Sequence, residues 1–298
     1  MNRAFPAPRR LLSSLAAAAA LLAASAAGAA ETERFEDPSR LVAIGGSLTE
    51  IVYALGEQDK LVARDSTAVY PPEAMALPDV GYMRQLSPEG VMSVNPSAIL
   101  LLDGSGPPEA VEVVRKASIP VVTVPDEYDR DGILTKIRVV GHALGVDGKA
   151  ASLAAQVEAD IKAAETATSK IESRKRVLFV LSMQGGRLLA SGSNTAADGI
   201  IRMAGAVNAI QGFEGYKQLS DEAVYEAKPD FVLMMDRGGD HGATADELFS
   251  HPAMAGTPAA ETRALVKMDG AWLLGFGPRT ASAVRELSAA LYGEAVGN

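Results

Sequence analysis

The 298-residue chain contains no cysteine, so its fold has no disulfide bonds and no thiolate metal site. The same absence removes the residue to which a lipoprotein signal attaches a lipid anchor. Histidine and tryptophan are also scarce, with three and one residues. Without cross-links the chain depends on its hydrophobic interior, and its length is enough for one or two cores.

Long apolar runs are absent as well. The run from Leu11 to about Ala23 is too short to span a bilayer. Basic residues (Arg3, Arg9 and Arg10) precede it, and the small residues of Ser25 to Ala30 follow it. This order is typical of a secretory signal peptide, here residues 1–30, cleaved near residue 29 or 30. We therefore expect an exported, periplasmic protein without direct membrane insertion. The Arg9-Arg10 pair leaves twin-arginine export open, although ordinary secretion is favoured.

Basic residues are in the minority. Without the three arginines of the signal, 25 basic side chains stand against 37 acidic ones. This balance argues against nucleic acid or an anionic membrane as the main partner. Any bound anion must therefore meet locally placed arginines.

The mature chain alternates short β-branched runs with longer amphipathic or alanine-rich stretches, which predicts an α/β fold with parallel strands. The spacing leaves room for a helix between most of the strands. The predicted strands are Leu41–Ile44, Leu61–Ala63, Ala98–Leu102, Val121–Val124, Val177–Leu181, Phe231–Met235 and Ala264–Lys267.

One segment, Asp147 to Ile171, has no proline and has glycine only at its start. Apolar residues recur in it at steps of three and four, which predicts a single helix of about 36 Å at 1.5 Å per residue. The residues on the expected buried face are Leu153, Val157, Ile161, Ala164, Thr168 and Ile171. A helix of this length between two α/β blocks indicates a rigid connection between two lobes, with an ordinary surface helix as the alternative.

Two short motifs occur on both sides of this segment. The pattern L-S-x-E-x-V begins at Leu86 and again at Leu219, and Gly46-Ser47-Leu48-Thr49 is matched by Gly192-Ser193-Asn194-Thr195. In the second motif we expect Ser or Thr to cap a helix that follows a strand. The shared order predicts two lobes of like topology, at residues 31–146 and 173–298, joined by a helix at 147–172.

At this level of detail the chain resembles the class III periplasmic binding proteins, in which one long helix joins two Rossmann-like lobes. Within that class it is similar to the haem-binding members, from about Arg40 to Tyr292. The segments that carry the resemblance are Ile44–Ile51, Asp65–Pro71, Leu77–Gly90, Asn194–Asp198 and Gly275–Thr280. The resemblance implies a monomeric protein that delivers haem b to an inner-membrane ABC permease and its ATPase.

Tyr70 is the residue that the resemblance implies as the axial ligand of the haem iron. It follows the second predicted strand, in a loop broken by Pro71-Pro72, where the carboxyl end of a strand would open toward a ligand. A phenolate is a hard anionic donor that suits ferric iron, and tyrosine ligation of haem is known. A loop tyrosine that only packs its ring on the surface is the alternative.

Haem also carries two propionates, which arginine recognises well. Arg84, Arg237 and Arg279 lie in turn-flanked segments and are the candidates, with surface solvation as the alternative for each. Arg84 and Arg237 are favoured because we expect them to approach from different lobes. Tyr82 is a candidate for stacking on the porphyrin, with core packing equally open.

Some haem-binding members add a histidine from the second lobe. The three histidines are His142, His241 and His251, and none lies near the strand Val177–Leu181 or the turn Ser182–Gly186 in the sequence. We therefore expect five-coordinate iron on Tyr70, unless His241 reaches it from the glycine-rich loop Gly238–Gly242.

The resemblance also implies a docking role for Glu89 and Glu222, the acids of the repeated motif, toward arginines of the permease. An acid at a helix N-terminus is favoured by the helix dipole in any case, so both interpretations stand together.

Enzyme motifs are missing: the chain has no H-E-x-x-H, no G-x-S-x-G and no Walker loop, so we expect a binding protein. Ferric siderophores and cobamides are the alternative ligands within the same class. Capture of a bare metal ion is disfavoured because it needs several converging His, Asp or Glu side chains. A haem-handling or haem-sensing protein that meets a receptor instead of an importer also stays open.

Overall fold

In the computed structural model, the described part of the chain comprises Met1 and residues 34–236 and 243–296. The predicted signal peptide and its cleavage site lie outside these residues. Residues 33–298 form one compact unit. No helix among the described residues is long and apolar enough to cross a membrane.

The first half of this unit is built on a four-stranded parallel sheet in the order β2-β1-β3-β4. Its strands are β1 (Leu41–Ile44), β2 (Leu61–Arg64), β3 (Ala98–Leu102) and β4 (Val121–Val124). Its helices are α1 (Gly46–Ala54), α2 (Pro88–Met92), α3 (Pro108–Arg115) and α4 (Arg130–Ala143), with 3₁₀ turns η1 (Gln58–Lys60), η2 (Pro72–Ala76) and η3 (Met83–Gln85). Strands β1 and β3 are wholly buried, as expected for central strands of a parallel sheet.

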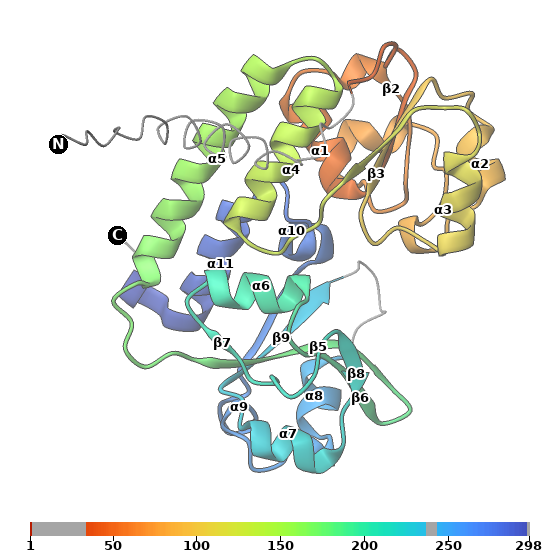
Figure 1. Ribbon diagram of the computed structural model, residues 1–298. Helices are drawn as coiled ribbons and strands as arrows, with labels where there is room; N and C mark the ends of the chain where they lie inside the picture. Colours follow the sequence, from red (N-terminus) through yellow and green to blue (C-terminus); the bar gives the residue numbers. More distant parts are fainter. Residues whose placement is uncertain (2–33, 237–242, 297–298) are drawn as a thin grey trace. The chain divides into compact units, whose positions relative to one another are not determined.

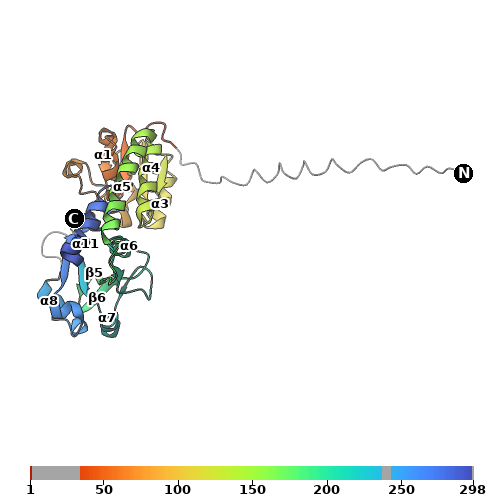
Figure 2. The ribbon, with the colours of Figure 1, turned by 90° about the vertical axis from the view of Figure 1, so that its left-hand side faces the viewer.

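The long helix α5 spans Asp147–Thr168 and packs against α4 and α11 (Figure 1, Figure 2). Its buried residues Val157, Ile161 and Ala164 follow the predicted periodicity. Two expected members of this face differ: Leu153 is only partly buried, and Ile171 lies beyond the end of the helix.

The second half contains a six-stranded sheet in the order β10-β9-β5-β6-β8, with β7 paired to β5. Its strands are β5 (Arg176–Gln184), β6 (Arg187–Ser191), β7 (Val207–Asn208), β8 (Tyr216–Gln218), β9 (Phe231–Asp236) and β10 (Leu265–Asp269). The helices are α6 (Ala196–Met203), α7 (Asp221–Ala227), α8 (Ala245–Phe249), α9 (Pro258–Thr262), α10 (Gly270–Leu274) and α11 (Thr280–Tyr292), with 3₁₀ turns η4 (Pro252–Met254) and η5 (Gly293–Val296).

The predicted α/β fold class is confirmed: the chain forms two β-sheets flanked by helices, and one long helix lies between the two sheets in the chain. The second sheet adds a feature that the periodicity did not predict, because β6 pairs antiparallel with both β5 and β8. The residue boundaries proposed for the two lobes stay a prediction.

The repeated motifs correspond to equivalent local structures. Ser87 and Ser220 each cap a short helix, α2 and α7, by accepting a hydrogen bond from the backbone three residues later. Thr195 caps α6 in the same way. The expectation of a Ser or Thr cap on α1 is wrong, because that helix begins after Gly45 and has no side-chain cap.

The α1 N-terminus is satisfied by a distant loop instead. The Gly46 amide donates to Thr67 Oγ1 at 2.8 Å, and the Gly45 amide donates to Asp65 Oδ1 at 3.0 Å. Gly45 has φ of 120°, and a Cβ on Gly46 would lie 2.5 Å from the Thr67 carbonyl oxygen. Glycine is therefore needed here for the loop to approach the helix.

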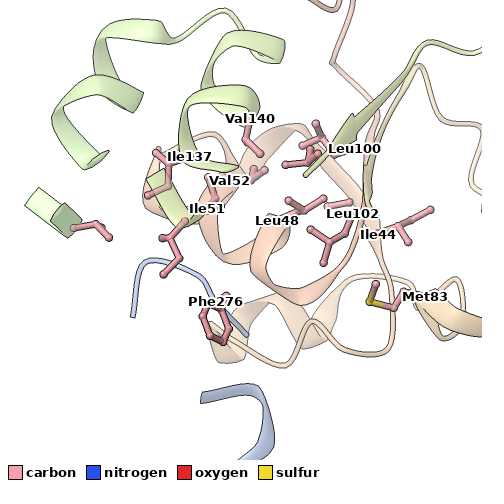
Figure 3. Packing of buried hydrophobic residues seen from close by; sticks show 14 of the residues in the cluster. Ile44, Leu48, Ile51, Val52, Met83, Leu100, Leu102, Ile137, Val140 and Phe276 are labelled. Atoms are coloured by element: carbon pink, nitrogen blue, oxygen red, sulfur yellow. The ribbon is translucent and has the colours of Figure 1, made fainter. Parts of the chain in front are cut away.

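One hydrophobic cluster includes residues from both halves of the unit. Figure 3 shows part of it, with Leu48 and Ile51 of α1, Ile137 of α4 and Phe276 between α10 and α11. A second, smaller cluster packs under the opposite side of the second sheet, around Leu178 and Val232. The shared cluster places the α10–α11 segment directly against α1, which positions the candidate site.

Candidate functional site

The segment that carries Tyr70 is anchored at its start by Asp65, whose side chain is fully buried. Asp65 accepts hydrogen bonds from the amides of Gly45, Thr67 and Met83 and from the Thr67 hydroxyl. Burial raises the pKa of Asp65, and the hydrogen bonds from Thr67, Gly45 and Met83 oppose this shift. One carboxylate thus ties both ends of the segment to α1.

Arg64, also buried, braces the middle of the same segment. Its guanidinium donates to the carbonyl oxygens of Asp65 and Ala74 at 3.0 and 3.2 Å and to Asp79 Oδ2 at 3.1 Å. Three contacts spread over 15 residues leave this irregular stretch little freedom. A loop held in this way can present a side chain in a defined place.

Tyr70 lies in this braced loop, before the cis peptide bond to Pro71, with 40% of its surface exposed. It lines a pocket of about 400 Å³ between the loop and the α10–α11 region. The other lining residues are Val69, Asp269, Ala271, Trp272, Arg279 and Glu286. The volume lies within the usual range for small-molecule sites.

Arg279 joins this loop to the other half of the unit. Its Nε and Nη2 each lie 2.9 Å from Glu50 Oε2, and its backbone amide donates to Glu50 Oε1 at 3.1 Å. The guanidinium carbon lies 3.5 Å from the centroid of the Tyr70 ring and 4.8 Å from that of the Trp272 ring. Arg279, expected to bind a propionate, is therefore engaged by a carboxylate and two aromatic rings.

Glu50 belongs to a buried charged network. Burial raises its pKa, and the nearby Arg279 charge opposes the shift. Lys136 of α4, fully buried, forms an ion pair with Asp126 at 2.6 Å and donates to the Phe276 carbonyl at 3.2 Å. Burial lowers the pKa of Lys136, while the Asp126 charge raises it. The network thus contains two ion pairs, Arg279 with Glu50 and Lys136 with Asp126.

A second group of polar and aromatic side chains surrounds Arg84. Burial raises the pKa values of the Tyr128 and Tyr216 phenols, and the charge of Arg84 opposes this shift. Tyr82, 42% exposed, is close enough to raise the pKa of Tyr216 through its charge. Arg84 and Tyr82 from the first half therefore lie close enough to Tyr216 of β8 in the second half for an electrostatic interaction.

Two aromatic pairs include the tyrosines of this group. The rings of Tyr128 and Phe276 meet edge to face with centroids 5.4 Å apart, and those of Phe179 and Tyr216 do so at 6.4 Å. Gly199 allows α6 to approach the backbone of Tyr128 closely, because a Cβ there would lie 2.4 Å from the Tyr128 carbonyl oxygen.

Two of the described histidines have one or both ring nitrogens in contact with other groups. His142 Nδ1 contacts Asp147 Oδ1 at 2.8 Å. His251 Nδ1 accepts from the Ala253 amide, and its Nε2 lies 2.7 Å from the Gly186 carbonyl oxygen. His251, which caps η4, is therefore close to the turn Ser182–Gly186 in space, although the two are far apart in the sequence.

His241 and Arg237 lie outside the described residues. Within the described parts of the chain, no group of three or more His, Asp or Glu side chains is placed to hold a metal ion.

Glu89 and Glu222 are both exposed, each in the first turn of its short helix. Ser87 Oγ donates to Glu89 Oε2 at 2.9 Å, and hydrogen bonding lowers the pKa of Glu89. The equivalent positions on α2 and α7 are what the repeated motif predicts.

Several residues of the site were not identified from the sequence. Glu50 and Lys136 carry no local signal of their role, because Arg279 and Phe276 lie far away in the chain. Tyr128 had a usable signal, since it follows the carboxyl end of β4, where ligands of parallel sheets bind. Tyr216 lies in a strand too short for its periodicity to be seen.

Comparison with solved structures gives two neighbours of 39% sequence identity. The periplasmic heme-binding protein BhuT, in complex with two hemes, has a TM-score of 0.80, with 86% of this chain and 98% of that chain covered. The periplasmic heme-binding protein RhuT from Roseiflexus sp. RS-1, in apo form, has a TM-score of 0.81, with 86% and 99% covered.

Relatives identified by sequence are more distant and have other names. An uncharacterized ABC transporter substrate-binding lipoprotein, YvrC of Bacillus subtilis, is 26% identical over 260 residues, covering 86% of this chain and 81% of its own. A vitamin B12-binding protein of Pectobacterium atrosepticum is 24% identical over 264 residues, covering 87% and 91%.

The family model described as periplasmic binding protein matches residues 41–271, which include both sheets, α5 and the Tyr70 loop. The expectation of a binding protein, not an enzyme, is confirmed by this family and by these neighbours. The chain belongs to the periplasmic binding protein family.

Proposed function

We propose that this protein captures haem through Tyr70 and delivers it, as a periplasmic monomer, to an inner-membrane ABC permease and its ATPase. The observation that carries the proposal is the exposed Tyr70 side chain on a loop that Asp65 and Arg64 hold in place. A ligand to ferric iron must be both accessible and fixed, and Tyr70 meets both conditions.

The surface around Tyr70 suits a large flat apolar ligand. Val69, Met75 and Tyr82 share its loop region and are also exposed. Exposed apolar side chains within one loop region are typical of a binding surface. A porphyrin offers two apolar faces to such a surface.

Arg84 is the best-placed candidate for a propionate among the described residues. Its guanidinium is near the phenols of Tyr128 and Tyr216, which add hydrogen-bonding groups for a carboxylate. Arg279 would have to leave Glu50 to serve in this way, so we assign it no propionate. Arg237 keeps this role as a prediction, outside the described residues.

Haem is favoured over the other ligands of the class by the neighbours of higher identity. Two solved structures of 39% identity belong to proteins described as heme-binding, whereas the relative named for vitamin B12 is 24% identical. A cobamide remains the second candidate because of that relative.

The iron is expected to be five-coordinate, with Tyr70 as its protein ligand. Of the two described histidines, His251 has both ring nitrogens engaged by other groups, and His142 has its Nδ1 engaged by Asp147. His241 stays a prediction, as the alternative sixth ligand. Tyrosinate-ligated ferric haem has a characteristic high-spin absorption spectrum.

The test is a titration of the purified protein with hemin, followed by absorption, for wild type and Tyr70→Phe. We expect a tyrosinate spectrum in wild type and its loss in the variant. Tyr225→Phe is the matched control, because Tyr225 is an exposed tyrosine on α7 and should change nothing. A tyrosinate spectrum that survives in Tyr70→Phe would refute the ligand assignment.

A parallel titration with cyanocobalamin and with a ferric siderophore addresses the second candidate. Binding of either compound, with no spectral change on hemin addition to wild type, would replace the haem proposal.

A further inference from the structure

The contacts of Arg279 suggest a role that differs from binding the ligand directly. Its side chain and backbone amide are both bound by Glu50, so the guanidinium has a fixed position and a fixed plane. Gly277 leaves room for the Glu50 carboxylate beside Arg279, because a Cβ there would lie 3.2 Å from Glu50 Oε1. A planar cation in a fixed position can restrict the conformation of a side chain that stacks on it.

What lies against this face is the ring of Tyr70, at 3.5 Å from the guanidinium carbon. A half-exposed tyrosine ring ordinarily samples several rotamers, and contact with a fixed plane favours one of them. The Glu50 carboxylate balances the charge of Arg279. The effect on Tyr70 is therefore mainly one of orientation.

We propose that Arg279 is a positioning residue for Tyr70: held by Glu50 and stacked on the tyrosine ring, it sets the direction in which the phenol oxygen meets the iron. This inference rests on the proposed role of Tyr70 as the iron ligand. Because Arg279 also contacts Trp272 of α10, it ties the ligand-bearing loop to the second half of the unit.

A double-mutant cycle between the two residues tests the proposal, with hemin affinity and the ferric absorption and EPR spectra as readouts. The variants are Arg279→Gln, Tyr70→Phe and the two combined. Arg279→Gln should lower hemin affinity by about 2- to 30-fold, the range of cation–π contacts, and should broaden the tyrosinate signals. In the Tyr70→Phe background the same substitution should have no further effect, because the oriented oxygen is already gone.

Arg279→Gln leaves the Glu50 carboxylate buried without its partner, which can disturb folding. The variant Glu50→Gln/Arg279→Gln removes both charges and keeps the test valid, with circular dichroism and thermal unfolding as folding checks. Arg285→Gln is the control, since Arg285 is an exposed arginine on α11, the helix that Arg279 precedes, and its side chain donates to Ser282 Oγ.

The outcomes separate this inference from the proposed function. An equal loss of affinity in both backgrounds would mean that Arg279 contacts hemin or acts through general stability, and would overturn the inference. No loss in either background would overturn it as well. If instead wild type shows no tyrosinate spectrum, or Tyr70→Phe retains one, the proposed function itself fails.

Discussion

Lys136 donates a hydrogen bond to the carbonyl oxygen of Phe276, which lies 140 residues further along the chain. The side chain of Lys136 is fully buried, and its strongest partner is the Asp126 carboxylate at 2.6 Å. The contact fastens α4 to the segment that precedes Arg279. Buried charges of this kind are tolerated only when they are paired.

Replacing Lys136 by methionine should therefore destabilise the protein strongly. Asp126 would be left without its cation and the Phe276 carbonyl without its donor, at a cost of about 3–5 kcal/mol in the free energy of unfolding. Urea denaturation measures the change. Adding Asp126→Asn to Lys136→Met should restore part of the loss, and an equal loss in the single and double variants would contradict the pairing.

Gly199→Ala should push α6 away from the loop that carries Tyr128. The new Cβ would lie 2.4 Å from the Tyr128 carbonyl oxygen and 3.0 Å from Phe276, so we expect a loss of about 1–3 kcal/mol in thermal or urea unfolding. Gly148→Ala is the matched control in α5, where nothing lies within 4 Å of the added carbon. There the substitution should stabilise the helix by up to about 1 kcal/mol. Similar effects at both positions would argue against the close contact at Gly199.

Glu57 should make the stability depend on pH. Burial by itself raises the pKa of Glu57, but hydrogen bonds and charges from Lys149 and Lys60 outweigh it and place the pKa below the usual value of 4.5. The unfolded state therefore binds the proton more tightly. The stability that Glu57 contributes is present above pH 4.5 and is lost as the pH falls through the folded-state pKa.

Urea unfolding of wild type and Glu57→Gln across about pH 3–6 should show a shallower slope in the variant. Glu112→Gln is the control, because its pair with Lys116 is largely exposed and should contribute little. A slope unchanged by Glu57→Gln would contradict the prediction.

Glu89 and Glu222 provide the test of docking. The double variant Glu89→Gln/Glu222→Gln should abolish haem uptake by cells that depend on this protein, and hemin affinity in solution should stay as in wild type. Both acids are exposed at the starts of equivalent helices, away from the contacts of Tyr70. Glu109→Gln, in the first turn of α3, is the matched control. Normal uptake by the double variant would exclude the docking role.

Local signals predicted much of the fold. Strands β1, β3 and β4 begin and end at the expected residues, and α5 begins at Asp147 as predicted. The helix cap at Thr195 was predicted from the second repeated motif. The missed strands β6 and β8 form an antiparallel arrangement of short segments, whose alternation is too brief to detect.

The site was predicted less completely. Resemblance pointed to Tyr70, and the structure places it on an exposed loop, although its iron-binding role stays a prediction. The cap of α1 was assigned wrongly because a loop 20 residues away supplies the groups that bind its amides. His251 reaches the β5–β6 turn from 65 residues away, which spacing in the sequence does not reveal.

Most strands and the long helix could be predicted from local residue patterns, because periodicity and capping depend on residues within a few positions of one another. Which charged side chains contact one another depends on long-range packing and could not be predicted in this way. Glu50 and Arg279 are 229 positions apart, and their contact exists because the hydrophobic core packs the segment after Phe276 against α1. That packing turns an arginine expected to bind a propionate into one that lies against the ring of Tyr70.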